Sequence, residues 1–463
     1  MKKYEQYKRI IKFLAGFITF GIETILYWLV WIRYYNDYIE MPFFRKGNWL
    51  MVAFYGILLL FFGGVYGGFK LGYLKKVDAI YSLILSLVCT NCLVYIQIAL
   101  LDRHFVNAWP LVVMSVVQAL AIILWINIFY WLYSVMFPPR RMLLIYGERP
   151  VFGLMEKIST RQDKYNICET VNIKVGLEKI YEKIEEYDGV IIGDIPSQIR
   201  NQLLKSCFEK GVRTYTLPKI SDIIMRGADE IHLFDSPLLL ARNNGFTFEQ
   251  KVIKRAMDIV LSLVGIVVTS PLMLLTAIAI KLYDGEHVIH KQVRLTQGGK
   301  EFEVYKFRSM IKDAEKDGVA RLYAEGDVRV TPVGKVIRKT RLDELPQLFN
   351  VLRGEMSLVG PRPERPQIAE EYLEYMPEFD YRLKVKGGLT GYAQIYGKYN
   401  TTPYDKLKLD LMYIENYSVW LDLKLIVMTI KILFMKESTE GVAEGQITAT
   451  LDENSFYKHK NKG

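Results

Sequence analysis

The sequence predicts a membrane protein built from three parts. These are a bundle of four transmembrane helices, a Rossmann-like parallel α/β domain, and a C-terminal α+β domain anchored by a re-entrant helix. Of the 463 residues, 51 % are hydrophobic, and they are concentrated in the first 140 residues and in one later segment. Between these regions strands alternate with helices, the order typical of a parallel sheet. The formal net charge of +10 favours partners that carry phosphate or anionic lipid.

Residues 1–140 contain four apolar segments, each reaching the roughly 20 residues that a helix needs to cross a bilayer. They lie at about 11–32, 49–69, 79–101 and 108–137. The N-terminus, the second loop and the segment after the fourth span are basic, which predicts that both ends of the bundle face the cytoplasm. Glu23 lies inside the first span. It is either a functional group of the membrane region or a residue of helix packing.

Residues 141–225 alternate short apolar strands with helices, which predicts a doubly wound parallel sheet. Strands are expected at 142–146, 166–173, 189–194 and 212–217. No G-x-G-x-x-G motif follows the first strand, so a structural or regulatory role is favoured over nucleotide binding. Residues 226–250 are predicted to be a linker.

The C-terminal domain, 251–463, begins with an apolar segment whose predicted membrane part is 252–283. Basic residues flank this segment on both sides, so the positive-inside rule places both ends in the cytoplasm. Pro271 removes a helical hydrogen bond and bends the chain, and the hydroxyl of Ser270 can satisfy the freed carbonyl. The pattern predicts a re-entrant helix that breaks at these two residues, with a fifth span as the alternative.

Two strands around a Gln297–Lys300 turn are predicted within 288–310. Lys306 and Arg308 alternate there with aromatic residues, so both can face one side of the second strand. The polar stretch 313–329 is either a lid or an ordinary loop.

The segment Arg338–Pro366 combines the adjacent carboxylates Asp343 and Glu344 with many basic residues. Carboxylates among guanidinium groups suit a phosphate-bearing substrate. The sequence has no nucleic-acid motif, so no nucleic-acid partner is expected. The alternative interpretation is that the two acids belong to an ordinary helix N-terminus.

Local signals place the two acids at the start of a helix that runs through Leu352. Thr340 and Asp343 have the spacing of a capping box, and the helix dipole is expected to keep Asp343 ionised. The proximity of two carboxylates predicts that one of the two pKa values is raised, as suits a base. Downstream, two prolines flank Arg362 and predict a rigid turn that fixes it.

These segments together resemble the bacterial sugar transferase family, monotopic phosphoglycosyl transferases that act on polyprenyl phosphate. The resemblance rests on KRAMDIV (254–260) with the later Ser-Pro, YKFRSM (305–310), D-x-R-x-T-x-x-G (327–334), RKTRLDELPQLFNVLRGEMSLVGPRP (338–363), LTGYAQIYGKYN (389–400) and LDLKLIVMTIKIL (421–433). The leading spans and the α/β domain resemble the large branch that transfers hexose 1-phosphate. The sequence departs at Gly387, where the family often has proline.

The resemblance implies a covalent mechanism. Asp343 would attack the β-phosphate of a UDP-hexose, glucose or galactose, and expel UMP, with Mg²⁺ bridging Asp343 and the pyrophosphate. Glu344 would handle the proton of undecaprenyl phosphate, which then attacks the phosphosugar–aspartate. The candidate phosphate-binding residues are Arg338, Arg362, Lys306, Arg308 and Arg341.

The resemblance also implies an integral protein of the bacterial cytoplasmic membrane whose catalytic domain faces the cytoplasm. Its product would start a capsule, exopolysaccharide or O-antigen repeat unit. A membrane glycosyltransferase that releases UDP and a non-catalytic scaffold for polysaccharide assembly are the alternatives. A homodimer formed through the bundle or the α/β domain is a further expectation.

Overall fold

The computed structural model describes residues 2–148, 152–241, 245–311, 329–397 and 401–433. The chain divides into two compact units, Met1–Leu217 and Pro218–Gly463. Of the predicted lid or loop at 313–329, all but Arg329 lies outside the described residues.

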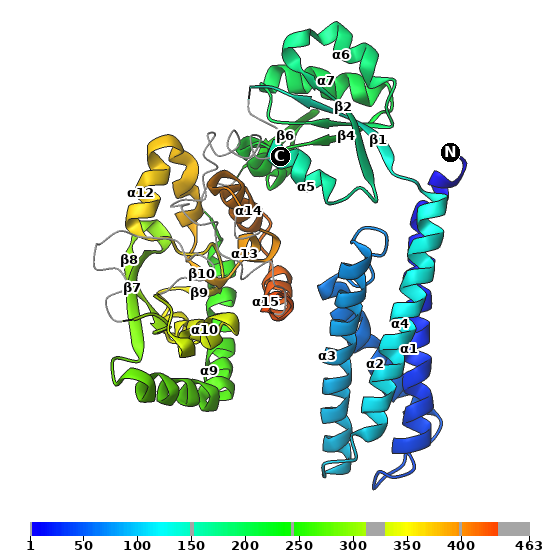
Figure 1. Cartoon of the computed structure of the whole chain (residues 1–463), viewed down its shortest axis with the longest axis vertical. Helices are drawn as coiled ribbons and strands as arrows, with labels where there is room; N and C mark the ends of the chain where they lie inside the picture. The colour runs from blue at the N-terminus through cyan, green and yellow to red at the C-terminus, as the bar shows by residue number, and fades with distance from the viewer. Residues whose placement is uncertain (1, 149–151, 242–244, 312–328, 398–400, 434–463) are drawn as a thin grey trace. The chain divides into compact units, whose positions relative to one another are not determined.

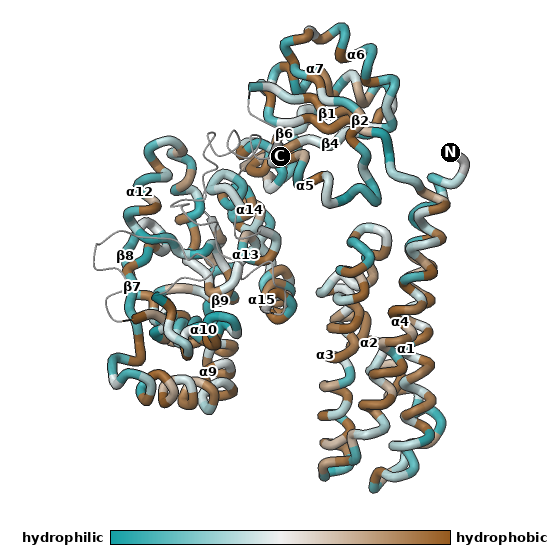
Figure 2. Tube along the Cα trace, in the orientation of Figure 1, coloured by the Kyte–Doolittle hydropathy of each residue, from teal (hydrophilic) through white to brown (hydrophobic). Residues whose placement is uncertain are grey.

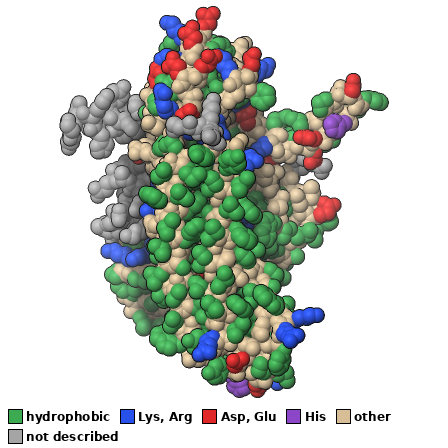
Figure 3. All heavy atoms as spheres, turned by 90° about the vertical axis from the view of Figure 1, so that its right-hand side faces the viewer, with side chains coloured by type: hydrophobic (Ala, Val, Ile, Leu, Met, Phe, Trp, Pro, Cys, Tyr) green, Lys and Arg blue, Asp and Glu red, His purple; other side chains and the backbone are tan. Residues whose placement is uncertain are grey.

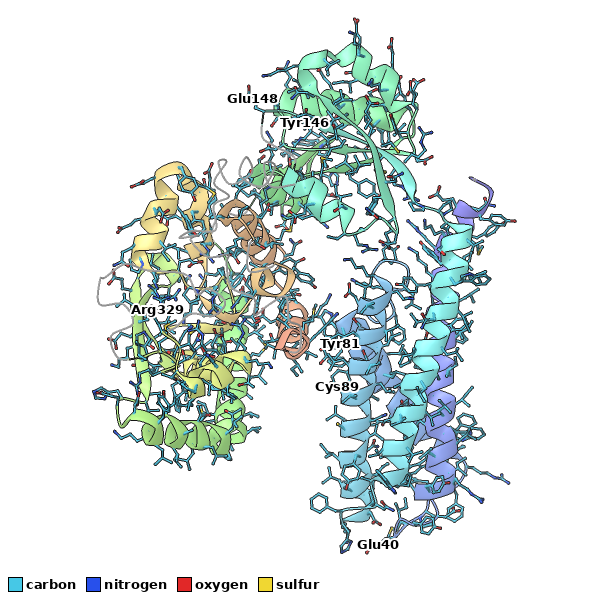
Figure 4. All side chains as sticks on the ribbon, viewed as in Figure 1. Glu40, Tyr81, Cys89, Tyr146, Glu148 and Arg329 are labelled. Carbon is cyan, nitrogen blue, oxygen red and sulfur yellow. The ribbon has the colours of Figure 1, made fainter. Side chains whose placement is uncertain are left out.

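The first unit starts with four long helices that lie side by side (Figure 1). They are α1 (Lys8–Val30), α2 (Lys46–Tyr66), α3 (Lys76–Asp102) and α4 (Trp109–Met136). Both α1 and α3 contact α2 and α4, which closes the bundle. These helices are brown in Figure 2, and hydrophobic side chains cover the face of the bundle seen in Figure 3. Glu40 lies in the loop between α1 and α2, at the end of the bundle away from the N-terminus (Figure 4).

These four helices and α9 (Phe248–Asp284) of the second unit are long and apolar enough to cross a membrane. The described part of the chain therefore has the helices of a membrane protein.

The interior of the bundle holds polar groups, as is usual where helices pack within lipid. Glu23 is 1 % exposed, and neither of its carboxylate oxygens has a hydrogen-bond partner among the described residues. The side-chain amide of Gln118 donates to the backbone carbonyl of Glu23 (3.0 Å) and to the hydroxyl of Tyr55 (2.9 Å). Glu23 thus lies in the packed interior of the bundle.

The α/β domain has the strands and helices that the sequence predicts, and its four strands are all parallel in the order β2-β1-β3-β4. The elements are β1 (Arg140–Tyr146), α5 (Phe152–Ser159), β2 (Tyr165–Asn172), α6 (Leu177–Ile184), β3 (Gly189–Ile192), α7 (Ser197–Glu209) and β4 (Arg213–Thr216). Alternate residues of β1 serve two cores: Leu143 packs with residues of α6 and α7, and Leu144 packs beside those of α5. Helices therefore cover both faces of the sheet.

The second unit begins earlier than the predicted domain boundary. Helix α8 (Ile220–Arg226) buries Ile223 in the core of the C-terminal unit, so the division falls after Leu217 instead of at residue 225. The predicted linker contains an exposed hairpin, β5 (Asp229–Leu233) with β6 (Ser236–Leu240).

Helix α9 changes direction sharply along its length (Figure 1). We call 248–270 its first arm and 271–284 its second arm. Pro271 is the proline inside this helix, and it leaves the carbonyl of Val267 without its backbone donor. The hydroxyl of Ser270 donates to that carbonyl at 2.8 Å, as predicted.

The remaining elements of this unit follow α9 in the chain. The hairpin of β7 (Ile289–Leu295) and β8 (Glu301–Phe307) is present as predicted, with its turn at Gln297–Gly299. Further along the chain are α10 (Pro332–Lys339), α11 (Gln347–Arg353), β9 (Ser357–Val359), α12 (Pro366–Tyr375), β10 (Gly388–Thr390), α13 (Tyr392–Tyr396), α14 (Pro403–Glu415) and α15 (Val419–Leu433). The main core of this unit gathers apolar side chains of α8, α11, β9, α12, α14 and α15.

Candidate active site

A tight turn between α10 and α11 presents the two acidic residues. Arg341 has a φ of +58°, a left-handed conformation that is uncommon for a residue with a side chain. It turns the chain into a 3₁₀ turn at Leu342–Glu344, which two residues separate from the start of α11. The hydroxyl of Thr340 donates back to the carbonyl of Val336 at 2.8 Å. The predicted capping box is therefore wrong, because Thr340 ends α10 and does not start the next helix.

Three basic side chains converge on one oxygen of Glu344. Arg362 Nη2 lies 2.8 Å from Oε1, Lys306 Nζ 3.6 Å and Arg341 Nη1 3.9 Å. These cations come from a loop, from β8 and from the turn itself, so only the folded chain brings them together. The arrangement makes Glu344 the neutralised member of the carboxylate pair.

Asp343 has the opposite surroundings. Its Oδ1 atom is buried and has no hydrogen-bond partner in the described part of the chain. A buried, unsatisfied acceptor is costly and indicates a missing water, ion or ligand. The described residues contain no cluster of three or more metal-ligating side chains.

The charges separate the two pKa values. Burial and the neighbouring charge of Glu344 raise the pKa of Asp343, and the nearby cations offset this only in part. Burial would also raise the pKa of Glu344, but the charges of Arg362 and Lys306 hold it well below its usual range. One pKa is raised, as predicted. It belongs to Asp343, which the helix dipole was expected to keep ionised, because the cations converge on Glu344 instead.

Arg362 extends from a firmly held loop, as its flanking prolines predict. Its carbonyl accepts a hydrogen bond from Arg382 (2.8 Å), whose guanidinium also pairs with Asp410 at 2.8 Å. A Cβ atom on Gly360 would lie 2.4 Å from the carbonyl oxygen of Lys386, so only glycine permits this close chain crossing.

The other predicted site residues lie at different distances from the carboxylates. Arg338 contributes to the electrostatic field at Asp343, and its Nη1 lies 3.4 Å from the hydroxyl of Ser309. Arg308 forms an ion pair with Asp284 at the end of α9. Phosphate binding by either residue stays a prediction. Ser270 and Pro271 are exposed on α9 and take no part in this cluster.

The first arm of α9 supplies three charged groups whose importance the sequence did not reveal. Lys254 Nζ pairs with Asp422 of α15 at 2.6 Å. Arg255 donates to the carbonyls of Val351 and Leu352 at the end of α11, both at 2.7 Å. The available signal was the presence of charges inside an apolar segment, where they need partners.

Asp258 completes this anchor by accepting hydrogen bonds at 3.0 Å from the hydroxyl of Ser357 and the amide of Leu358. The second arm packs Met273 and Ile280 against side chains of β8 and α10. Helix α9 therefore supports both sides of the turn that carries the carboxylates.

Helix α15 places one of its charged residues, Asp422, in the core of the C-terminal unit. Asp422 is 0 % exposed and also accepts a hydrogen bond from the hydroxyl of Tyr413 at 2.8 Å. Its charge faces the core of the unit, because Lys254 neutralises it there.

The model for the bacterial sugar transferase family matches residues 249–436. An uncharacterized sugar transferase of Bacillus subtilis, EpsL, is 38 % identical over 208 residues, which cover 44 % of this chain and all of EpsL. A UDP-N-acetylgalactosamine-undecaprenyl-phosphate N-acetylgalactosaminephosphotransferase of Aeromonas hydrophila is 40 % identical over 50 % of this chain and 54 % of its own length.

A UDP-glucose:undecaprenyl-phosphate glucose-1-phosphate transferase of Klebsiella pneumoniae is 38 % identical over 57 % of this chain and 56 % of that protein. The chain thus spans about half the length of these two relatives. The matched region contains α9, the hairpin, the carboxylate turn and the loop of Arg362. The chain belongs to the bacterial sugar transferase family.

Proposed function

We propose that the protein transfers hexose 1-phosphate from a UDP-hexose to undecaprenyl phosphate and releases UMP. The observation that carries this proposal is a buried, unpartnered carboxylate oxygen on Asp343 next to a group of fixed cations. A bare carboxylate among cations suits attack on a phosphate whose charge those cations stabilise. The names of the relatives support undecaprenyl phosphate as acceptor.

The transfer takes two steps. A carboxylate oxygen of Asp343 forms a bond to the β-phosphorus of the UDP-hexose, and the bond from that phosphorus to the bridging oxygen breaks, so UMP leaves. An oxygen of undecaprenyl phosphate then attacks the same phosphorus and releases Asp343. Arg362 and Lys306 face the pair of carboxylates and would bind the phosphate oxygens in both steps.

Glu344 is proposed to handle the proton of the acceptor phosphate. In the ligand-free protein its cations make it a weak base. A bound substrate phosphate would compete for Arg362 and Lys306, which would remove neutralising charge from Glu344 and raise its pKa. Its proton affinity would thus increase when the acceptor is present.

Mg²⁺ is the proposed cofactor, and Asp343 is the residue that would hold it. The orphaned Oδ1 fits this role, since Mg²⁺ is usually bound by one or two carboxylates and by substrate phosphates. When bound, it would neutralise the pyrophosphate and favour the ionised form of Asp343.

We further propose that α9 is re-entrant and that the catalytic unit lies on the cytoplasmic side of the inner membrane. The bend at Pro271, the satisfied carbonyl of Val267 and the exposed apolar side chains of both arms support a helix that enters one leaflet and returns. The basic flanks favour the cytoplasmic side for both ends.

Nucleotide release tests the proposed reaction. Purified full-length protein is incubated with Mg²⁺, undecaprenyl phosphate and, separately, UDP-glucose, UDP-galactose or UDP-N-acetylgalactosamine. We expect lipid-dependent UMP with one donor and none from Asp343→Asn. Release of UDP would indicate an ordinary glycosyltransferase. Absence of turnover with every donor, from protein shown to be folded, would favour the scaffold.

A further inference from the structure

A group of basic and aromatic side chains lies where the bundle meets the α/β domain in the first unit. We call it the basic junction. Its members are Lys8, Lys12, Tyr73, Tyr133, Arg161 and Lys164. They come from α1, the loop between α2 and α3, α4, and the segment before β2. The carboxylate site belongs to the other unit, so the mechanism proposed above leaves this cluster unused.

Tyr73 brings the cations together. Lys12 Nζ lies 3.5 Å from the centre of its ring, and Lys164 Nζ lies 5.3 Å from the same centre. The two ammonium nitrogens are therefore less than about 9 Å apart. The carbonyl of Tyr73 also accepts hydrogen bonds from Lys164 (2.7 Å) and Arg161 (2.9 Å). The ring and the carbonyl attract these cations without neutralising them.

Carboxylates are too few to balance this charge. Glu5 pairs with Arg140, and Asp163 pairs with Arg161 at 2.9 Å. Within the described part of the chain, no carboxylate lies within ion-pair distance of the three lysines of the basic junction. The lysines thus hold unpaired positive charge at fixed positions.

Burial and mutual repulsion both disfavour the charge on these groups. Burial, together with the smaller effects of the charges of Arg161 and Lys12, lowers the pKa of Lys164 to about 8. An anion placed among them would relieve both the burial cost and the repulsion.

We propose that the basic junction binds the phosphate group of an anionic membrane lipid. Lys8 and Lys12 lie four residues apart on one face of α1, in the first turns of a helix long and apolar enough to span the membrane. This is the depth at which lipid headgroups lie, and basic pockets there favour anionic headgroups. Since Lys164 belongs to the α/β domain, a lipid phosphate held between it and Lys12 would connect that domain to the bundle.

The test uses the full-length protein in nanodiscs of phosphatidylcholine alone or with phosphatidylglycerol. We measure the thermal unfolding midpoint (Tm) and, by native mass spectrometry, the lipid that stays bound. Phosphatidylglycerol is expected to raise the Tm of the wild type by about 2–4 °C and to remain bound. Lys12→Gln/Lys164→Gln should lose both effects, and Lys12→Arg/Lys164→Arg should keep them.

The matched control is Lys70→Gln/Lys75→Gln, which removes two exposed charges from the loop that contains Tyr73. It has the same net charge as Lys12→Gln/Lys164→Gln. It should respond to phosphatidylglycerol as the wild type does. For each protein the shift in Tm is taken relative to the same protein in phosphatidylcholine alone, so a variant of lower basal stability can still be tested. Equal loss in both glutamine variants would overturn the proposal in favour of general surface charge. Inorganic phosphate that reproduces the shift in phosphatidylcholine discs would overturn the assignment to lipid.

Discussion

The C-terminal unit buries two groups of charges, one beneath the first arm of α9 and one at the 3₁₀ turn. Beneath α9 the charges are matched, meaning that each has a partner: Lys254 pairs with Asp422, and Asp258 accepts two hydrogen bonds. At the turn they do not match, because three cations converge on Glu344 while Asp343 keeps an unpartnered oxygen. Matched charges fix a structure, whereas unmatched ones leave interactions open for a ligand.

The strongest way to break this comparison is to remove the unmatched carboxylate. Asp343→Asn is expected to lower activity at least about 1,000-fold if Asp343 is the nucleophile. Its pKa is raised in the native state, so the native protein binds its proton more tightly than the unfolded chain, and the ionised form costs stability at neutral pH. The variant should therefore unfold at the same Tm as the wild type or a higher one.

UMP release and differential scanning fluorimetry measure the two effects, with Asp380→Asn, at an exposed aspartate, as the control. A variant that loses activity and also has a much lower Tm would show that Asp343 stabilises the fold, as Lys254 and Asp422 do.

The matched region predicts the opposite result. Lys254→Met leaves Asp422 charged and buried, which costs about 3–5 kcal/mol of stability and lowers the Tm of this unit by about 10 °C. Lys254→Met/Asp422→Leu should recover most of that loss, and Tyr413 then keeps its bond to the carbonyl of Val359 (3.2 Å). Thermal unfolding and limited proteolysis measure this. A double variant less stable than the single one would contradict the comparison.

Lys306, one of the cations at the carboxylate turn, should make both activity and stability depend on pH. Burial lowers its pKa to about 8, although the charge of Glu344 opposes this. Its charged fraction, and with it kcat/KM for the UDP-hexose, should fall about fivefold between pH 8 and 9. Stability changes in the other direction: from about pH 8 to the ordinary lysine pKa the unfolded chain holds the extra proton, so stability rises with pH.

The matched variant is Lys306→Arg, which stays charged throughout this range. Its kcat/KM should be nearly constant from pH 8 to 9. An equal decline in the variant would assign the pH dependence to another group.

The smallest expected effect is at the bend of α9, where a side-chain hydroxyl replaces the missing backbone donor of one carbonyl group. Ser270→Ala leaves the carbonyl of Val267 unsatisfied and should cost about 1 kcal/mol, seen as a fall in Tm. Thr269→Val removes a similar bond to the carbonyl of Gly265, but that carbonyl has a backbone donor within the helix. The valine variant should lose less, and equal losses would remove the special role of Ser270.

Local patterns predicted much of the fold. The four strands of the α/β domain, the hairpin of β7 and β8, and the hydrogen bond of Ser270 all depend on neighbouring residues, and all are present. The boundary at Leu217 was missed because Ile223 is buried by residues far along the chain.

The sequence predicted which residues form the candidate site better than it predicted their pKa values. Asp343, Glu344 and Arg362 lie close in sequence, and they meet in the structure. The order of the two pKa values was not predictable, since it depends on Arg362 and Lys306 both contacting Glu344, and Lys306 arrives from β8. The pairing of Lys254 with Asp422 spans 168 residues, so a charge beside an apolar segment signalled the need for a partner but did not identify it.

The attachment of the first arm of α9 has a practical consequence for making a water-soluble form of this protein. Arg255 binds the end of α11 and Asp258 binds β9, so deleting the hydrophobic helix would remove part of the folded C-terminal unit. The outer face, in contrast, consists of exposed apolar side chains such as Val264 and Leu274. Solubilisation should therefore proceed by replacing the residues of that outer face with polar ones, while every residue of the inner face is retained.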